Sequence, residues 1–332
     1  MSSSQIDPDQ LPPTAAGEIV RIGPDDRPTA IARLLGATPS RAEPAGADRF
    51  LAFAAANDVP LEDLWARVDG SGRILDCVLA VPNPGRTAVL FASPPATRES
   101  DDHLAAVIDR ATGALVDRDV HLAQVLLEPH DRRRRRAFLA GGFTTLAQLS
   151  YLERALPPPR PTGAIDLPSG VTVRSYDEAA DHADLVAILE ASYEDTLDCP
   201  GLRGLRQTDD ILTGHRETGE FDPALWSIAR DESGPAGALL LNRAPASQTI
   251  ELVYIGLAPR LRGCGIGRGL LRHGLHLVDE RPERAVTLAV DERNEPALAL
   301  YRREGFRRVL RRTALIRSLR SPGFSTEDHQ DP

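Results

Sequence analysis

The feature that most constrains the fold is an internal repeat, because the two halves of the chain share landmarks at a nearly constant spacing. Three pairs carry it: Trp65 with Trp226 (161 positions apart), Gly72 with Gly234 (162) and Gly142-Phe143 with Gly305-Phe306 (163). The two tryptophans are the only ones in the chain, and each follows a leucine. Spacings that differ by so little indicate that the chain contains two copies of one domain.

Prolines divide the chain of 332 residues near its middle. Residues 157–170 contain five prolines, a composition typical of a semi-rigid linker. Residues 1–16 and 321–332 are polar and lack apolar periodicity, which predicts disordered tails. We therefore expect an N-terminal domain over 17–156 and a C-terminal domain over 171–320.

Hydrophobic periodicity predicts an α+β fold for each copy. In the second copy it predicts strands over 171–176, 225–230, 236–243, 249–257, 285–290 and 307–317, and helices over 179–192, 209–218, 266–280 and 296–304. In the first copy it predicts helices over 101–116 and 131–140 and strands over 121–127 and 144–151. Each domain is expected to be a mixed, mostly antiparallel sheet flanked by helices.

Composition narrows the functional classes. The net charge is −9 and all 39 basic residues are arginines, a balance that disfavours a broad nucleic-acid surface. The sequence has neither a secretory signal nor an apolar run long enough to span a membrane. Three distant cysteines favour neither a disulfide framework nor a zinc site. We expect a cytoplasmic protein without metal, nucleic acid or membrane as a partner.

A glycine-rich turn between a strand and a helix is the most informative segment of the second copy. It reads Arg262-Gly263-Cys264-Gly265-Ile266-Gly267-Arg268. Glycines let several backbone N–H groups point at one spot beside the positive end of a helix, where a phosphate can bind. The G-x-G-x-x-G dinucleotide spacing fails, and a Walker loop needs a lysine that this chain lacks. A nucleotide-binding oxidoreductase is therefore disfavoured.

Two motifs resemble those of the GNAT superfamily of N-acetyltransferases. Arg262-x-x-Gly265-x-Gly267 resembles its R-x-x-G-x-G pyrophosphate loop, and Asn294 to Phe306 resembles its N-x-x-A-x-x-L-Y-x-x-x-G-F pattern. The resemblance implies a tandem GNAT architecture with acetyl-CoA as cosubstrate. The contacts it implies are Ile255, Gly256 and Leu257 with pantetheine, Arg262, Gly263, Cys264, Gly265, Ile266, Gly267 and Arg268 with pyrophosphate, and Asn294 with CoA.

Direct acetyl transfer to an amine needs a base and a proton donor for the departing thiolate. The resemblance places the hydroxyl of Tyr301 near the CoA sulfur, so Tyr301 is predicted to be the proton donor. Glu251 stands where some members carry a catalytic glutamate and is predicted to be the base, with a solvated carboxylate as the alternative. Regular strand alternation would put Glu251 on the side of Ile255 and Leu257.

Other residues near the predicted site are weaker candidates. Tyr254 and His215 are alternative bases, although a helical histidine is more often a partly exposed surface residue. The resemblance assigns the acceptor pocket to the first two helices and their loop, here 193–206, which contains Glu194, Asp195, Asp198 and Cys199. These side chains suit a cationic amine, or they form a solvated loop.

The first copy departs from the motifs. Residues 91–101 contain two prolines and no glycine, and the run Arg132 to Arg136 stands where the second copy has its downstream helix. We expect a degenerate domain that does not bind CoA, with the arginine run as a solvated helix face or a contact for an anion.

The sequence thus predicts an N-acetyltransferase that acts on a primary amine of a small molecule or peptide, as a monomer or homodimer. A noncatalytic acyl-CoA-binding regulatory protein is the alternative from another class.

Overall fold

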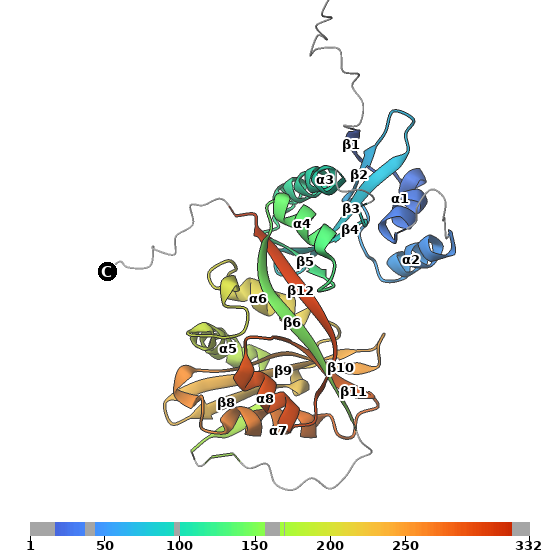
Figure 1. Ribbon diagram of the computed structural model, residues 1–332. Coiled ribbons are helices and arrows are strands. Elements are labelled where there is room, and N and C mark those ends of the chain that lie inside the picture. The colour runs from blue at the N-terminus through green and yellow to red at the C-terminus, as the bar shows by residue number, and fades with distance from the viewer. Residues whose placement is uncertain (1–16, 37–43, 96–99, 157–166, 169, 321–332) are drawn as a thin grey trace, which may run out of the picture.

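The computed structural model describes residues 17–36, 44–95, 100–156, 167–168 and 170–320 (Figure 1). The two predicted tails and most of the predicted linker therefore lie outside the described residues. The helices are α1 (Arg27–Leu34), α2 (Pro44–Ala56), α3 (Ser100–Ala114), α4 (Arg132–Ala140), α5 (Glu178–Tyr193), α6 (Thr208–Arg216), α7 (Ile266–Leu277) and α8 (Glu295–Arg303). The strands are β1 (Glu18–Arg21), β2 (Leu64–Val68), β3 (Ile74–Asn83), β4 (Thr87–Ala92), β5 (Leu122–Leu127), β6 (Thr144–Ala155), β7 (Thr172–Ser175), β8 (Trp226–Asp231), β9 (Gly234–Ala244), β10 (Thr249–Leu257), β11 (Ala285–Asp291) and β12 (Arg307–Ser318).

All of these strands form one sheet in which the two halves exchange their last strands. The order is β1-β2-β3-β4-β5-β12-β6-β11-β10-β9-β8-β7. The last strand of the second half, β12, pairs with β5 of the first half, and β6 of the first half pairs with β11 of the second. Figure 1 shows β6 and β12 side by side through the middle of the molecule. The mixed, mostly antiparallel α+β fold is confirmed, and each half is completed by a strand from the other.

The two halves repeat each other at an offset of 162 positions in this part of the sheet, which corrects the tryptophan pair. The pairing of β2 with β3 shifts between Arg67 and Val68, and that of β8 with β9 shifts at the matching positions, Ala229 and Arg230. At this offset Trp65 corresponds to Ser227, one residue past Trp226. A slip of one residue turns a side chain to the other face of a strand, so the two tryptophans enter different cores.

Helices cover both faces of the sheet. In the second half, α5 and α6 pack on one face around Trp226, and α7 and α8 pack on the other around Leu252 and Leu288. The first half is built alike, with α1 and α2 on one face and α3 and α4 on the other. We call the two sides of the second half the α5–α6 face and the α7–α8 face.

Two predicted element boundaries differ from the structure by three residues or more. Helix α7 ends at Leu277 instead of position 280, ahead of Pro282, which disfavours helix in the residue before it. Strand β6 continues to Ala155 instead of Tyr151, because Leu149 to Ala155 pair with β11 of the other half. Local periodicity cannot reveal a pairing partner that lies 130 residues away.

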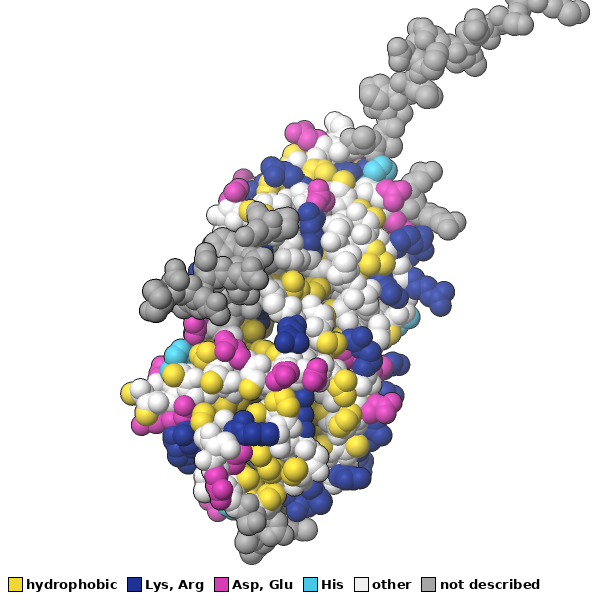
Figure 2. All heavy atoms as spheres, turned by 90° about the vertical axis from the view of Figure 1, so that its left-hand side faces the viewer, with side chains coloured by type: hydrophobic (Ala, Val, Ile, Leu, Met, Phe, Trp, Pro, Cys, Tyr) yellow, Lys and Arg dark blue, Asp and Glu magenta, His cyan; other side chains and the backbone are white. Residues whose placement is uncertain are grey.

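Two surface features bear on the predicted partners. Within the described ranges, no helix combines the length and apolar character that crossing a bilayer demands. On the face shown in Figure 2, arginine and acidic side chains are interspersed, and neither sign forms a continuous patch.

Candidate active site

The second half opens a gap in its sheet between β10 and β11. These parallel strands pair only at three positions, and the last pair is Glu251 with Thr287. Strand β10 continues to Leu257 beside β9 alone. Because Ala258 N–H donates to Ala236 O on the β9 side (2.8 Å), alternation turns the N–H groups of Ile255 and Leu257 toward the gap. Backbone donors therefore line the gap where the sequence predicted pantetheine contacts.

A β-bulge changes the face on which Glu251 lies. Val253 is an extra residue between the Leu252–Leu241 and Tyr254–Leu240 pairs. The predicted alternation is therefore wrong: Glu251 shares the α5–α6 face with Tyr254, whereas Ile255 and Leu257 pack on the α7–α8 side. A bulge reorients the strand at this point and places the carboxylate at the mouth of the gap.

The glycine-rich turn presents a row of unpaired donors at the start of α7. Gly263 (φ 76°) and Gly265 (φ 82°) are left-handed, and a Cβ on either would point into open space. Among the described residues, the N–H groups from Gly263 through Gly267 make no hydrogen bond, whereas Arg268 N–H donates to Gly265 O (3.1 Å). Such a nest at a helix N-terminus fits a phosphate group.

The two arginines of the turn bind the protein itself. The guanidinium of Arg262 donates to Leu257 O (3.2 Å) and to Ser192 O (2.8 Å), which ties the turn to the end of α5. Arg268 forms an ion pair with Glu304, the residue that follows α8 (2.5 Å). The cradle is therefore made of backbone groups, with the arginines bracing it.

The second motif forms helix α8 as its sequence predicts. The Asn294 side chain caps the helix by accepting from Ala297 N–H (3.3 Å), and Pro296 stands in the first turn. Tyr301 is 5% exposed and packs edge-on against Phe306, with ring centroids 5.7 Å apart. Burial raises the pKa of Tyr301, and the charge of Asp198 adds to this rise. The phenol is therefore held in its protonated form.

Glu251 is a half-buried carboxylate without a hydrogen-bonding or ion-pair partner among the described residues. Burial raises its pKa, because the charged form loses hydration that nothing nearby replaces. A raised pKa suits a group that must take up a proton near neutral pH.

His215 on α6 is half-buried, in line with the partly exposed position expected for it. Its Nε2 atom is buried without a hydrogen-bond partner, and its ring lies 5.7 Å from that of Tyr254. Burial lowers the pKa of His215 to about 4, and the charge of Arg206 contributes. The imidazole is neutral at pH 7 and forms part of the wall behind Tyr254.

Ser192 is a site residue that sequence reasoning missed. Its hydroxyl hydrogen-bonds with the hydroxyl of Tyr254, and the phenol lies over the α-carbon of Gly256. A Cβ on Gly256 would lie 2.0 Å from that hydroxyl oxygen. Position 256 therefore needs glycine, because the Tyr254 hydroxyl approaches its backbone closely. The sequence of the strand does not reveal this contact.

Gly256→Ala is expected to displace the Tyr254 ring from its contact with Ser192 and to lower the melting temperature by several degrees. Thermal unfolding checks this, with Gly267→Ala as the control, because a Cβ there meets only ordinary contacts, with Leu257 at 3.6 Å and Leu300 at 3.9 Å. Equal destabilisation by the two variants would contradict the close contact between Tyr254 and the backbone of Gly256.

The predicted acceptor loop is fastened to the end of β11. Asp198 Oδ1 accepts from Asp291 N–H (2.8 Å), and Cys199 N–H donates to Asp291 Oδ2 (3.3 Å). Asp198 is exposed overall, but partial desolvation of its carboxylate raises its pKa. Burial raises the pKa of Cys199 to about 12, which leaves an unreactive thiol. Glu194 and Asp195 are exposed.

The first half carries different groups at the matching positions. Strand β4 pairs with β5 at three positions as in the second half, and Val89 occupies the place of Glu251. Phe138 occupies the place of Tyr301 and packs edge-on against Phe143, with centroids 5.0 Å apart. Neither the predicted base nor the predicted acid has a counterpart there.

In the first half, the carboxylate of Asp101 lies in the first turn of α3. Asp101 is 2% exposed and pairs with Arg133 (3.0 Å) and Arg136 (3.2 Å) of α4. Arg134 donates to Ala92 O (3.1 Å) at the end of β4. Three members of the arginine run therefore bind inside the first half, while Arg132, Arg135 and Arg136 are exposed, as a solvated helix face predicts.

Residues 188–306 match the acetyltransferase (GNAT) family, so the second half of the chain carries a GNAT domain. A mycothiol acetyltransferase of Salinispora tropica is 36% identical over 168 residues, which are 48% of this chain and 52% of that protein. One of Streptomyces bingchenggensis is 31% identical over 191 residues, which are 56% of this chain and 54% of that protein. The chain spans about half the length of these curated relatives.

Solved structures extend the likeness in fold to most of the chain. A GCN5-related N-acetyltransferase from Sphaerobacter thermophilus has a TM-score of 0.61 at 20% identity, over 94% of this chain and 98% of that one. A glucosamine N-acetyltransferase region of a fungal multi-domain GH3 β-N-acetylglucosaminidase has a TM-score of 0.58 at 16% identity, over 91% of this chain and 38% of that one. In the part of the chain that the structure describes, no cluster of three or more His, Cys, Asp or Glu side chains is placed to hold a metal.

Proposed function

We propose that this chain, whose second half is a GNAT domain, is an acetyl-CoA-dependent N-acetyltransferase with a single active site. One observation carries the proposal: among the residues that the structure describes, only the second half combines free backbone donors, a base and a phenol around the gap in its sheet. The first half has Asp101, Val89 and Phe138 at the corresponding places.

The residues around the gap fit the chemical groups of acetyl-CoA. The open N–H groups of Gly263 to Gly267 suit its pyrophosphate, and those of Ile255 and Leu257 suit its extended pantetheine arm, as an added strand would be held. When bound there, acetyl-CoA supplies the acetyl group as a thioester. Asn294, whose side chain caps α8, lies in the turn that joins the end of β11 to α8.

Glu251 and Tyr301 approach the gap from opposite faces of the sheet. The Glu251 carboxylate takes the proton of the acceptor amine, a task for which burial has raised its pKa. The Tyr301 hydroxyl, protonated at neutral pH, donates a proton to the leaving sulfur. Asp198 stands near enough to act on the Tyr301 charge, so it favours the protonated phenol.

The acceptor is a primary amine of a small molecule or peptide, and the enzyme acts as a monomer or homodimer in the cytoplasm without a metal. The matched relatives carry the name mycothiol acetyltransferase, so their acceptor belongs in any panel of amines. Mass spectrometry of reactions with acetyl-CoA and such a panel tests the proposal. An acetylated amine formed with free CoA supports it, whereas binding of acetyl-CoA without any acetylated product favours the regulatory alternative.

Gly265→Ala is expected to weaken acetyl-CoA binding at least 10-fold. The new methyl group points into the open space of the cradle, and the left-handed backbone (φ 82°) becomes strained. Calorimetric titration measures the change. Gly72→Ala is a matched control, because Gly72 has φ 80°, an open surrounding and a place in the first half. Equal affinity in the Gly265→Ala variant and the wild type would contradict the cradle.

A further inference from the structure

A row of side chains on the α5–α6 face lies beside Glu251 and is not used by the chemistry described above. Ala289 stands on β11, near the middle of the twelve-stranded sheet, yet it is exposed. Its neighbours Thr287 and Tyr151 are only half-buried. An exposed alanine at a central strand position shows that no helix covers the sheet there.

Strand register places a residue of the first half in the same row as the predicted base. Glu251 on β10 pairs with Thr287 on β11, and Ala289, two residues on, pairs with Tyr151 on β6. Paired residues point to the same face, so these side chains stand in one row on the α5–α6 face. The small side chain of Ala289 leaves the space between the Glu251 carboxylate and the Tyr151 ring open.

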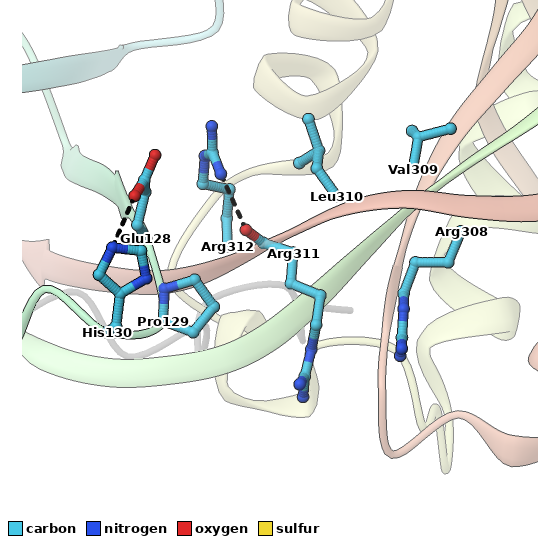
Figure 3. A pocket seen from close by; sticks show the side chains of 8 residues that line it. All are labelled: Glu128, Pro129, His130, Arg308, Val309, Leu310, Arg311 and Arg312. Carbon is cyan, nitrogen blue, oxygen red and sulfur yellow. Dashed lines mark hydrogen bonds and ion pairs between the residues drawn. The ribbon is translucent and has the colours of Figure 1, made fainter.

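Arg312 extends the row onto β12. Tyr151 pairs with Leu310 there, and Leu149 pairs with Arg312. Figure 3 shows Leu310 and Arg312 on one side of β12, and Arg308 and Arg311 on the other, around a hollow of about 400 Å³.

The arginines on the two sides of β12 have different partners. Arg311 and Arg308 pair with Glu292, and Glu128 in the same hollow pairs with His130 (3.0 Å). Half-buried Arg312 has no ion pair among the described residues, and its guanidinium donates to Arg311 O (2.9 Å).

Electrostatics agree with this placement. Burial raises the pKa of Tyr151, the charge of Glu251 raises it further, and the charge of Arg312 lowers it. The phenol therefore lies within the field of both groups, with a carboxylate at one end of the row and a guanidinium at the other.

We infer that this row is the acceptor site, and that the acceptor is an amine that also carries an anionic group. The amine binds at Glu251, the body of the molecule lies over Ala289 against Tyr151, and the anionic group binds Arg312. Strands β10 and β12 are three spacings apart, roughly 14 Å between backbones, so inward-reaching side chains leave room for a molecule of dipeptide size. This inference rests on the proposed function and gives the first half a role, since Tyr151 belongs to it.

The test is steady-state kinetics of the full chain with matched acceptors, namely dipeptides with a free carboxylate and the same dipeptides as amides. The wild type is expected to prefer the carboxylate member at least 10-fold in kcat/KM. Arg312→Gln should raise KM for that member about 10-fold and leave the amide unchanged. Tyr151→Phe should raise KM for both members and leave the acid limb of the pH profile in place.

Arg311→Gln is the matched control, because it removes the same charge one residue away on the opposite face. Arg311→Gln should leave KM unchanged for both the carboxylate and the amide member of each dipeptide pair. Acetylation without preference for the carboxylate, or an Arg312→Gln effect that is equal on both members, overturns the acceptor assignment and leaves the proposed function standing. Failure to acetylate any amine overturns both.

Discussion

Glu251→Gln is expected to lower kcat/KM for the amine about 10²- to 10⁴-fold, the usual contribution of a general base. The amide keeps the size of the side chain and cannot accept the proton. Affinity for acetyl-CoA should stay within 2-fold, because the backbone donors of the turn are untouched. Because burial penalises the charged carboxylate, the variant should unfold at the same temperature as the wild type or higher at pH 7.

The pH profile separates this role from a structural one. Wild-type kcat/KM should fall as pH drops through the raised pKa of Glu251, since the base works only when ionised. In the Glu251→Gln variant this acid limb should disappear. Glu217→Gln, an exposed carboxylate at the end of α6, is the control and should keep both rate and profile. An unchanged acid limb in the Glu251→Gln variant would assign the base elsewhere.

Tyr301→Phe is expected to lower kcat about 10²-fold or more with acetyl-CoA affinity retained, because only the proton donor is lost. The fold should tolerate the change, since the first half already has Phe138 at this position with the same edge-on contact. Stopped-time assays of CoA release give kcat, and calorimetry gives the affinity.

Tyr176→Phe is the matched control for the tyrosine. Tyr176 is also 5% exposed, but it lies under α5 beside Trp226 and away from the gap. Its loss of one hydroxyl should leave kcat within about 3-fold, as is usual for a substitution that touches no reacting group. A similar fall in kcat for both variants would show that Tyr301 acts through packing alone.

Much of this molecule follows from its sequence, because the decisive signals are local. The glycine turn, the Asn294 cap and the order of helices and strands each depend on residues close together in the chain, and the structure has them where they were expected. The internal repeat was also predictable from the sequence. The pairing of Trp65 with Trp226 was wrong by one residue, because an identical residue type does not show which face of a strand the side chain takes.

The remaining features depend on contacts between distant residues. The bulge at Val253 decides the face of Glu251, yet nothing in the strand sequence distinguishes it from regular alternation. The exchange of β6 and β12 brings Tyr151 into the second half, and no local pattern reports it. The role of Asp101 at the start of α3 depends on its ion pairs with Arg133 and Arg136 of α4. These pairs join two helices, so no local pattern predicts them.

The central claim is that one fold occurs twice and only the second copy binds and uses acetyl-CoA. Calorimetric titration of the full chain with acetyl-CoA tests it most directly, because the measurement counts sites. We expect one site per chain, weakened at least 10-fold by Gly265→Ala and unchanged by Gly72→Ala. Two sites per chain, no site, or a single site that Gly265→Ala leaves intact would contradict it.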